Sequence, residues 1–192
     1  MLNFKHGRKC IFENDFTGFK AMINHTNANY YDGGGHHKWT LLHHVANMYN
    51  NTHYNPLFIT CLVQDCQAAL NVQTSAGNTP LHFVVNSPGI SAIHCIKTLL
   101  ELGSNQHLRN KDGQTVIERR LALLFFENDP VIWLLLEYGA KISTGYVPKY
   151  VSRMINARRS ARHTAVIIIG IRRYQRSSVN RYSKDHRKFC VD

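Results

Sequence analysis

A two-part apolar pattern recurs along this chain at intervals of 36 to 39 residues. The first part is a threonine followed by apolar residues, and its copies begin at Thr40, Thr79 and Thr115. The second part has two apolar residues, two others and two more apolar residues, and its copies begin at Phe58, Cys95 and Val131. A weaker version of the second part begins at Gly18. Repetition at such a period predicts a stack of similar units that share one core, here about three and a half of them.

Each copy reads as a pair of antiparallel helices. In the middle copy Thr79 is a good N-cap, and Pro80 suits the first helical position, where its missing N–H has no partner to lose. Leu81, Val84 and Val85 then fall on one helical face.

The second helix of each copy has its own start and stop signals. Asn55-Pro56 and Asp129-Pro130 predict its start in two copies, and Ser91 is the expected cap in the middle copy. Gly103 and Gly139 predict its end, because glycine readily adopts the left-handed conformation that closes a helix.

Residues Gly77-Asn78-Thr79-Pro80-Leu81-His82, followed by Leu99-Leu100-x-x-Gly103 and Asp112-Gly113-Gln114-Thr115, resemble the ankyrin repeat. The resemblance covers roughly residues 16–142. The neighbouring copies depart from the family pattern: Lys38 replaces the turn glycine, Leu41 replaces the proline, and Val116-Ile117-Glu118 replaces Pro-Leu-His. More loosely, irregular copies followed by a basic segment are similar to accessory ankyrin proteins of large DNA viruses.

The resemblance implies an all-α, ankyrin-like solenoid of stacked antiparallel helix pairs with turn or hairpin loops, followed by a basic C-terminal capping segment. We expect an ankyrin-repeat domain over residues 1–144 and a basic helical cap and tail over residues 145–192. The expected repeat cores are 16–36 (partial), 37–73, 74–110 and 111–143.

The family binds proteins through its turn tips and its first-helix face, which implies a non-enzymatic scaffold or adaptor for a protein partner. Carried over position by position, the candidate contact residues are Trp39, Asn47, Met48, Ser75, Ala76, Asn78, Asn86, Ser87, Lys111, Asp112, Gln114, Ala122 and Leu123. Trp39 and Met48 are of types that interface cores favour. The alternative for Trp39 is that it packs on a neighbouring loop.

An enzyme is the rival class, and the twelve histidines are its main support. His36, His37, His43 and His44 cluster near Cys61 and Cys66, yet no C-x-x-C or H-E-x-x-H spacing is present. Cys95 lies beside His94 but at an apolar repeat position, which favours a buried, inert thiol. Gly33-Gly34-Gly35 lacks the lysine of a phosphate-binding loop. We therefore expect no catalysis, no metal and no cofactor.

The net charge of +11 is concentrated in the tail. Residues 1–144 hold eleven Lys and Arg against ten Asp and Glu, whereas residues 145–192 hold twelve against two. The tail's candidate basic patch is Arg158, Arg159, Arg162, Arg172, Arg173 and Arg176. These arginines fit a phosphate-contacting patch, a nuclear import signal, a handle for an acidic protein, or a solvated tail. The alternative function is thus a nucleic-acid-associated factor that acts through this segment.

Several features of the sequence favour an intracellular location. No stretch approaches the roughly 18 apolar residues of a membrane span, and the N-terminus lacks the apolar segment of a secretory signal. The five scattered cysteines do not suggest a disulfide framework. We expect an intracellular monomer, cytoplasmic or nuclear, without membrane contact.

Overall fold

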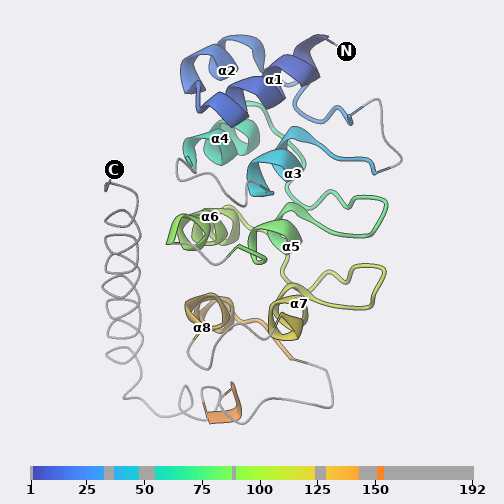
Figure 1. Ribbon diagram of the computed structural model, residues 1–192, viewed down its shortest axis with the longest axis vertical. Coiled ribbons are helices and arrows are strands. Elements are labelled where there is room, and N and C mark those ends of the chain that lie inside the picture. The colour runs from blue at the N-terminus through green and yellow to red at the C-terminus, as the bar shows by residue number, and fades with distance from the viewer. Residues whose placement is uncertain are drawn as a thin grey trace, which may run out of the picture.

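The computed structural model describes residues 2–32, 37–47, 55–87, 90–123, 129–142 and 151–153, and every regular element within these ranges is helical. The elements are α1 (Leu2–Glu13), α2 (Phe16–Met22), α3 (Leu41–Ala46), α4 (Leu57–Thr60), the π-helix η1 (Cys61–Asp65), α5 (Pro80–Val84), α6 (Ile90–Glu101), α7 (Val116–Ala122) and α8 (Pro130–Glu137). Figure 1 shows them as layered pairs: α1 with α2, α3 with α4, α5 with α6, and α7 with α8. Contacts of α5 with α3 and α7, and of α6 with α4 and α8, join the lower layers.

The first helices of the two best-matched layers begin where the threonines predict. Thr79 Oγ1 accepts a hydrogen bond from the His82 N–H at 3.4 Å, and Pro80 follows it as the first residue of α5. Thr115 Oγ1 accepts from the Glu118 N–H at 3.5 Å. Each threonine satisfies a backbone donor that the helix leaves without an internal partner. The predicted cap at Thr79 is confirmed, and Thr115 has the same role in the next copy.

Two of the three predicted starts of the second helices are confirmed. Pro56 precedes α4, and Asp129 caps α8 by accepting from the Val131 N–H at 2.9 Å. The prediction for Ser91 was wrong, because Ser91 lies within α6 (Ile90–Glu101) rather than directly before it. Ile90 packs against the core, and its inclusion in the helix brings that apolar side chain inward.

The predicted ends of α6 and α8 are confirmed. Gly103 and Gly139 adopt φ values of 94° and 89°, in the left-handed region. The following N–H of Ser104 then reaches back to the Leu99 carbonyl at 2.9 Å. Ala140 makes the equivalent bond to Leu135, so both helices close in the same way.

The first, incomplete copy begins earlier in the chain than the expected start of its repeat core at residue 16. Helix α1 lies before the expected start at residue 16 and pairs with α2. Phe4, Cys10 and Ile11 are buried on its inner face. A Cβ atom on Gly7 would lie 3.2 Å from Leu41 Cδ1, so α1 also approaches α3 closely. The N-terminal segment therefore completes a helix pair at this end of the stack.

One apolar core runs through the layers. Its register follows the repeat: equivalent positions of the second helices, Ile59, Ile96 and Ile132, are all buried. Beyond α8, residues 151–153 are helical and Val151 is buried, within the segment 145–192 where a helical cap and tail are expected. The rest of the proposed capping segment and the arginine patch lie outside the described residues.

Candidate partner-binding surface

Two turns project from the layers, at residues 74–78 and 110–114, and they have the same internal hydrogen bonds. The Thr74 N–H donates to the Asn78 carbonyl at 2.9 Å, and the Gly77 N–H donates to the Thr74 carbonyl at 2.8 Å. Both bonds recur 36 residues later, from Asn110 to Gln114 and from Gly113 to Asn110, each at 3.0 Å. The tips of successive layers thus share one conformation, and they lie one below the other on the right of Figure 1.

Hydrogen bonds also tie each tip to the next one. The Ser75 N–H donates to the His37 carbonyl, and the Lys111 N–H donates to the Ala76 carbonyl, both at 2.9 Å. Gln73 Nε2 donates to the Gly77 carbonyl at 2.7 Å and to the Arg109 carbonyl at 2.9 Å. Because two of these bonds join main chain to main chain and the Gln73 side chain bridges both turns, the turns form a continuous ridge rather than independent loops. We call residues 73–78 and 109–114 the turn ridge.

Gly77 is held under the next turn. Its φ of 76° is in the left-handed region, and a Cβ atom there would lie 2.8 Å from the Lys111 backbone nitrogen. Gly113 has nearly the same φ, 73°, but no described atom lies within 4 Å of its ideal Cβ position. A substitution at Gly113 therefore introduces backbone strain alone, whereas one at Gly77 introduces both backbone strain and a steric clash with the next turn.

We expect Gly77→Ala to destabilise the protein by at least about 1 kcal/mol more than Gly113→Ala. Both substitutions carry the cost of a left-handed alanine, about 1–2 kcal/mol. Only Gly77→Ala must also displace the main chain of Lys111. Urea unfolding followed by circular dichroism measures both values. Equal losses would contradict the close approach of the two turns.

Buried histidines fasten the turn ridge to the first helices. His82 Nδ1 accepts from the Thr79 N–H at 3.2 Å, so Nε2 carries the proton and donates to the Gln114 carbonyl at 3.2 Å. His43 makes the same contacts with Thr40, at 3.1 Å, and with the Asn78 carbonyl, at 3.2 Å. Burial lowers the pKa of each ring to about 4, which keeps both rings neutral at pH 7. Each histidine is thus bonded at both nitrogens, which leaves neither free as a general base.

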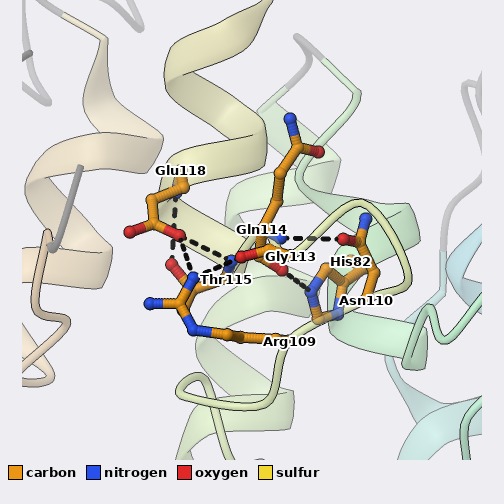
Figure 2. A network of polar contacts seen from close by, with 7 residues as sticks. All are labelled: His82, Arg109, Asn110, Gly113, Gln114, Thr115 and Glu118. Atoms are coloured by element: carbon orange, nitrogen blue, oxygen red, sulfur yellow. Dashed lines mark hydrogen bonds and ion pairs between the residues drawn. The ribbon is translucent and has the colours of Figure 1, made fainter. Parts of the chain in front are cut away.

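A carboxylate takes the histidine's place in the third copy. Glu118 Oε2 accepts from the Thr115 N–H and from Arg109 Nη1, both at 2.9 Å. Arg109 Nη1 also donates to the Gly113 carbonyl. Figure 2 shows this network together with the bond from His82 to the Gln114 carbonyl. The departure from the family motif at Glu118 is therefore accompanied by an arginine partner, and the turn is still fastened to its helix.

The predicted contact residues differ in how far they reach the surface. The exposed ones are Ala76, Lys111, Asp112, Ala122 and Leu123. The half-buried ones are Trp39, Asn47, Ser75, Asn86 and Gln114. Asn78 and Ser87 are buried, contrary to the expected exposure. Met48 and the arginines Arg158, Arg159, Arg162, Arg172, Arg173 and Arg176 lie outside the described residues.

Asn78 is buried because it joins two turns. Its Oδ1 accepts from Asn110 Nδ2 at 3.1 Å, and its backbone N–H donates to Thr74 Oγ1 at 3.2 Å. Ser87 is buried beside Arg120, whose Nη1 donates to the Ser87 carbonyl at 3.3 Å. Both residues are occupied by contacts within the protein, so we remove them from the candidate surface.

Trp39 packs against the first helices α3 and α5, rather than on a neighbouring loop as its alternative interpretation expected. Its ring centroid lies 4.6 Å from that of Phe83 and 5.0 Å from that of His44. It is half-buried against the core. Trp39 therefore contributes to the packing between α3 and α5.

Some surface residues of the turn ridge were missed. Gln73 and Arg109 are exposed and stand at equivalent positions of the two copies, directly before the turns. Arg119 Nε donates to Asn86 Oδ1 at 3.2 Å on the first-helix face. The repeat offset of 36 residues could have found Gln73 and Arg109, but the bond from Arg119 depends on the packing of α5 on α7.

The histidines and cysteines are the residues on which an enzyme would depend. In the described ranges, no three His, Cys, Asp or Glu side chains are placed to hold a metal ion. Cys95 is fully buried, and burial raises the pKa of its thiol. It also raises the pKa of the Cys61 thiol to about 11. Thiols that stay protonated are poor nucleophiles.

The family model of the ankyrin repeat matches residues 76–111, which include the end of the first turn, α5, α6 and the start of the second turn. Residues 76–111 are thus similar to an ankyrin repeat. Ankyrin repeats in general mediate protein–protein interactions, and the family is a scaffold rather than an enzyme class. No curated protein matches the chain, so the looser likeness to viral ankyrin proteins gains no support. Among the described helices, none is long and apolar enough to cross a membrane.

Proposed function

We propose that the protein is a non-enzymatic scaffold or adaptor that binds a protein partner through the turn ridge and the adjoining first helices. The observation that carries the proposal is the main-chain hydrogen bonding from tip to tip, from His37 to Ser75 and from Ala76 to Lys111. A surface that is already ordered loses little conformational entropy on binding. The likeness to the ankyrin repeat supports the general role, and the ordered turn ridge supports this location for the binding surface.

The exposed side chains of this surface combine charge and apolar area. Lys111 and Asp112 stand at one tip, with Ala76 at the tip before it. Ala122 and Leu123, at the end of α7, add an apolar edge, and Leu123 is 38% exposed. Such a surface suits a partner with an apolar anchor flanked by polar groups, the usual arrangement at protein interfaces.

The proposed architecture extends the layers to the whole chain. We infer an ankyrin-like solenoid over residues 1–144, closed by a cap and tail over residues 145–192. The buried Val151 and the helical residues 151–153 support a capping role, since a terminal layer needs its apolar face covered. We further propose that the protein acts as an intracellular monomer.

The test is capture of partners from a nuclease-treated cell lysate by the full chain and by a ridge variant. The variant carries Ala76→Glu, Lys111→Ala, Asp112→Ala and Leu123→Ala, all at exposed positions. We expect one identified protein to bind the unchanged chain and to bind the variant at least about tenfold more weakly, because interface anchors commonly contribute that much.

A matched control carries His94→Ala and Lys97→Ala. Both residues are exposed on α6, the second helix of the α5–α6 layer. It should retain the partner, and both variants should keep the helical signal of the unchanged chain. If the ridge variant and the control capture the same proteins equally, the ridge is not the binding site.

The charge of the tail favours the second candidate, a nucleic-acid-associated factor. Twelve Lys and Arg against two Asp and Glu over residues 145–192 would attract phosphates, and each neutralised phosphate would add about 0.9 to the slope of log affinity against log salt. Capture that requires intact nucleic acid and is lost with the tail arginines would support this candidate over the scaffold.

A further inference from the structure

The second helix of the α3–α4 layer ends differently from its equivalents. Cys66 stands at the repeat position that Gly103 and Gly139 occupy at the ends of α6 and α8. Those glycines take up the left-handed conformation directly after the helix. Cys66 keeps a φ of −109°, and the left-handed residue is instead Gln67, with a φ of 55°.

The extra residue is accommodated by a wider turn. Helix α4 continues as the π-helix η1, and the Cys66 N–H donates to the Cys61 carbonyl, five residues back, at 3.0 Å. The Ala68 N–H then reaches the Leu62 carbonyl, six residues back, at 2.8 Å. The equivalent bond of α6, from Ser104 to Leu99, spans only five residues. Loss of the glycine thus moves the helix end by one residue and opens its last turn.

This wider turn brings two thiols together. In an α-helix, residues five apart point about 140° away from each other, whereas a π-turn stacks them. The thiols of Cys61 and Cys66 share a hydrogen bond, and both side chains are buried, at 3% and 4% exposure. The backbone hydrogen bond from the Cys66 N–H to the Cys61 carbonyl fixes the spacing of the two residues.

We propose that Cys61 and Cys66 form a reversible dithiol–disulfide pair, a site of oxidation by small disulfides such as oxidised glutathione. The other described cysteines, Cys10 and Cys95, are buried thiols on α1 and α6. The pair is a property of this layer alone among the described second helices, because it depends on the residue that replaced the helix-ending glycine.

The reaction balances without any further reactant. A thiolate of the pair attacks one sulfur of the small disulfide, forms a mixed disulfide and expels the first small thiolate. The second thiolate of the pair attacks the protein sulfur of that bond, forms the Cys61–Cys66 bond and expels the second small thiolate. Two protein thiols lose two electrons in total, the small disulfide gains them, and the two protons leave with the two small thiols.

Cys61 and Cys66 are free thiols in the structure. Burial raises the pKa of both thiols, and Cys66 raises that of Cys61 further. Because the thiolate is the attacking form, oxidation should be slow at neutral pH and faster as the pH rises. Once the first thiol has reacted, its neighbour is already in contact, which favours closure over release of the mixed disulfide.

The experiment treats the folded full chain with an excess of oxidised glutathione at several pH values. Cys190, outside the described residues, is replaced by serine throughout so that it does not react. Intact mass and peptide mapping should show a Cys61–Cys66 cystine, with the loss of two hydrogen atoms, over a glutathione adduct by more than about ten to one. A dithiol reductant should reverse it.

Two single variants serve as controls. Cys66→Ser should stop the reaction at a glutathione adduct on Cys61 or leave that thiol reduced, without cystine. Cys10→Ser should leave cystine formation unchanged. A stable adduct on Cys61 or Cys66 of the parent chain would overturn the proposal. So would two reduced thiols in the folded chain under conditions that oxidise the urea-unfolded chain.

Discussion

Arg120→Ala is expected to lower the free energy of unfolding by about 3–5 kcal/mol, the cost of breaking a buried ion pair from one side. Arg120 Nε donates to Asp129 Oδ2 at 2.6 Å, and both side chains are only 2% exposed. Its Nη1 also donates to the Val85 carbonyl at 2.6 Å. The variant leaves a carboxylate and a carbonyl buried without this donor. Urea unfolding at pH 7, followed by circular dichroism, measures the loss.

The neighbouring arginine is the matched control for this prediction. Arg119 is half-buried, and its Nε donates to Asn86 Oδ1 at 3.2 Å. Arg119→Ala should lower the free energy of unfolding by less than about 1 kcal/mol, because a hydrogen bond from a partly solvated donor contributes little to stability. Similar costs for Arg119→Ala and Arg120→Ala would mean that the pair of Arg120 with Asp129 is not held away from water.

The repeat predicts the layers well because it combines independent local signals. A capping threonine, an early proline and a closing glycine each select a helix boundary from the residues beside them, as at Thr79, Pro80 and Gly103. Such signals need no knowledge of the neighbouring layer. At Cys66 the closing glycine is absent. The residues beside it then indicate only that the helix ends in another way, and the sequence analysis did not predict the π-turn.

Contacts between layers could not be predicted in the same way. Asn78 has a turn position that suggests exposure, but its amide is buried against Asn110, 32 residues later. The charge of Arg120 likewise suggests a surface residue, yet Asp129 and the carbonyl of Val85 meet it in the interior. Burial of a polar side chain depends on partners from another layer, so the sequence predicts the surface less well than the helices.

The last prediction concerns acid, and it follows from His43 and His82. Their pKa values, lowered to about 4 by burial, compare with about 6.5 in an unfolded chain. The folded state therefore favours the neutral rings. The stability that they contribute is complete above pH 6.5 and is lost as the pH falls toward 4. Between pH 7 and pH 5, protonation of each ring should lower the free energy of unfolding by about 2 kcal/mol, or by about 4 kcal/mol for the two rings together.

A variant with His43→Gln and His82→Gln isolates this effect. Glutamine at the third helical position can still accept from the capping residue's N–H, as Glu118 does from Thr115 in the third copy. His44, whose pKa is also lowered to about 4 by burial, titrates in both proteins and cancels in the comparison. We expect the variant to be less stable at pH 7 but to lose about 4 kcal/mol less than the unchanged chain between pH 7 and pH 5, in urea titrations at each pH. Parallel losses would show that protonating the two rings does not oppose folding, and that their bonds to the Asn78 and Gln114 carbonyls do not hold the turns to the helices.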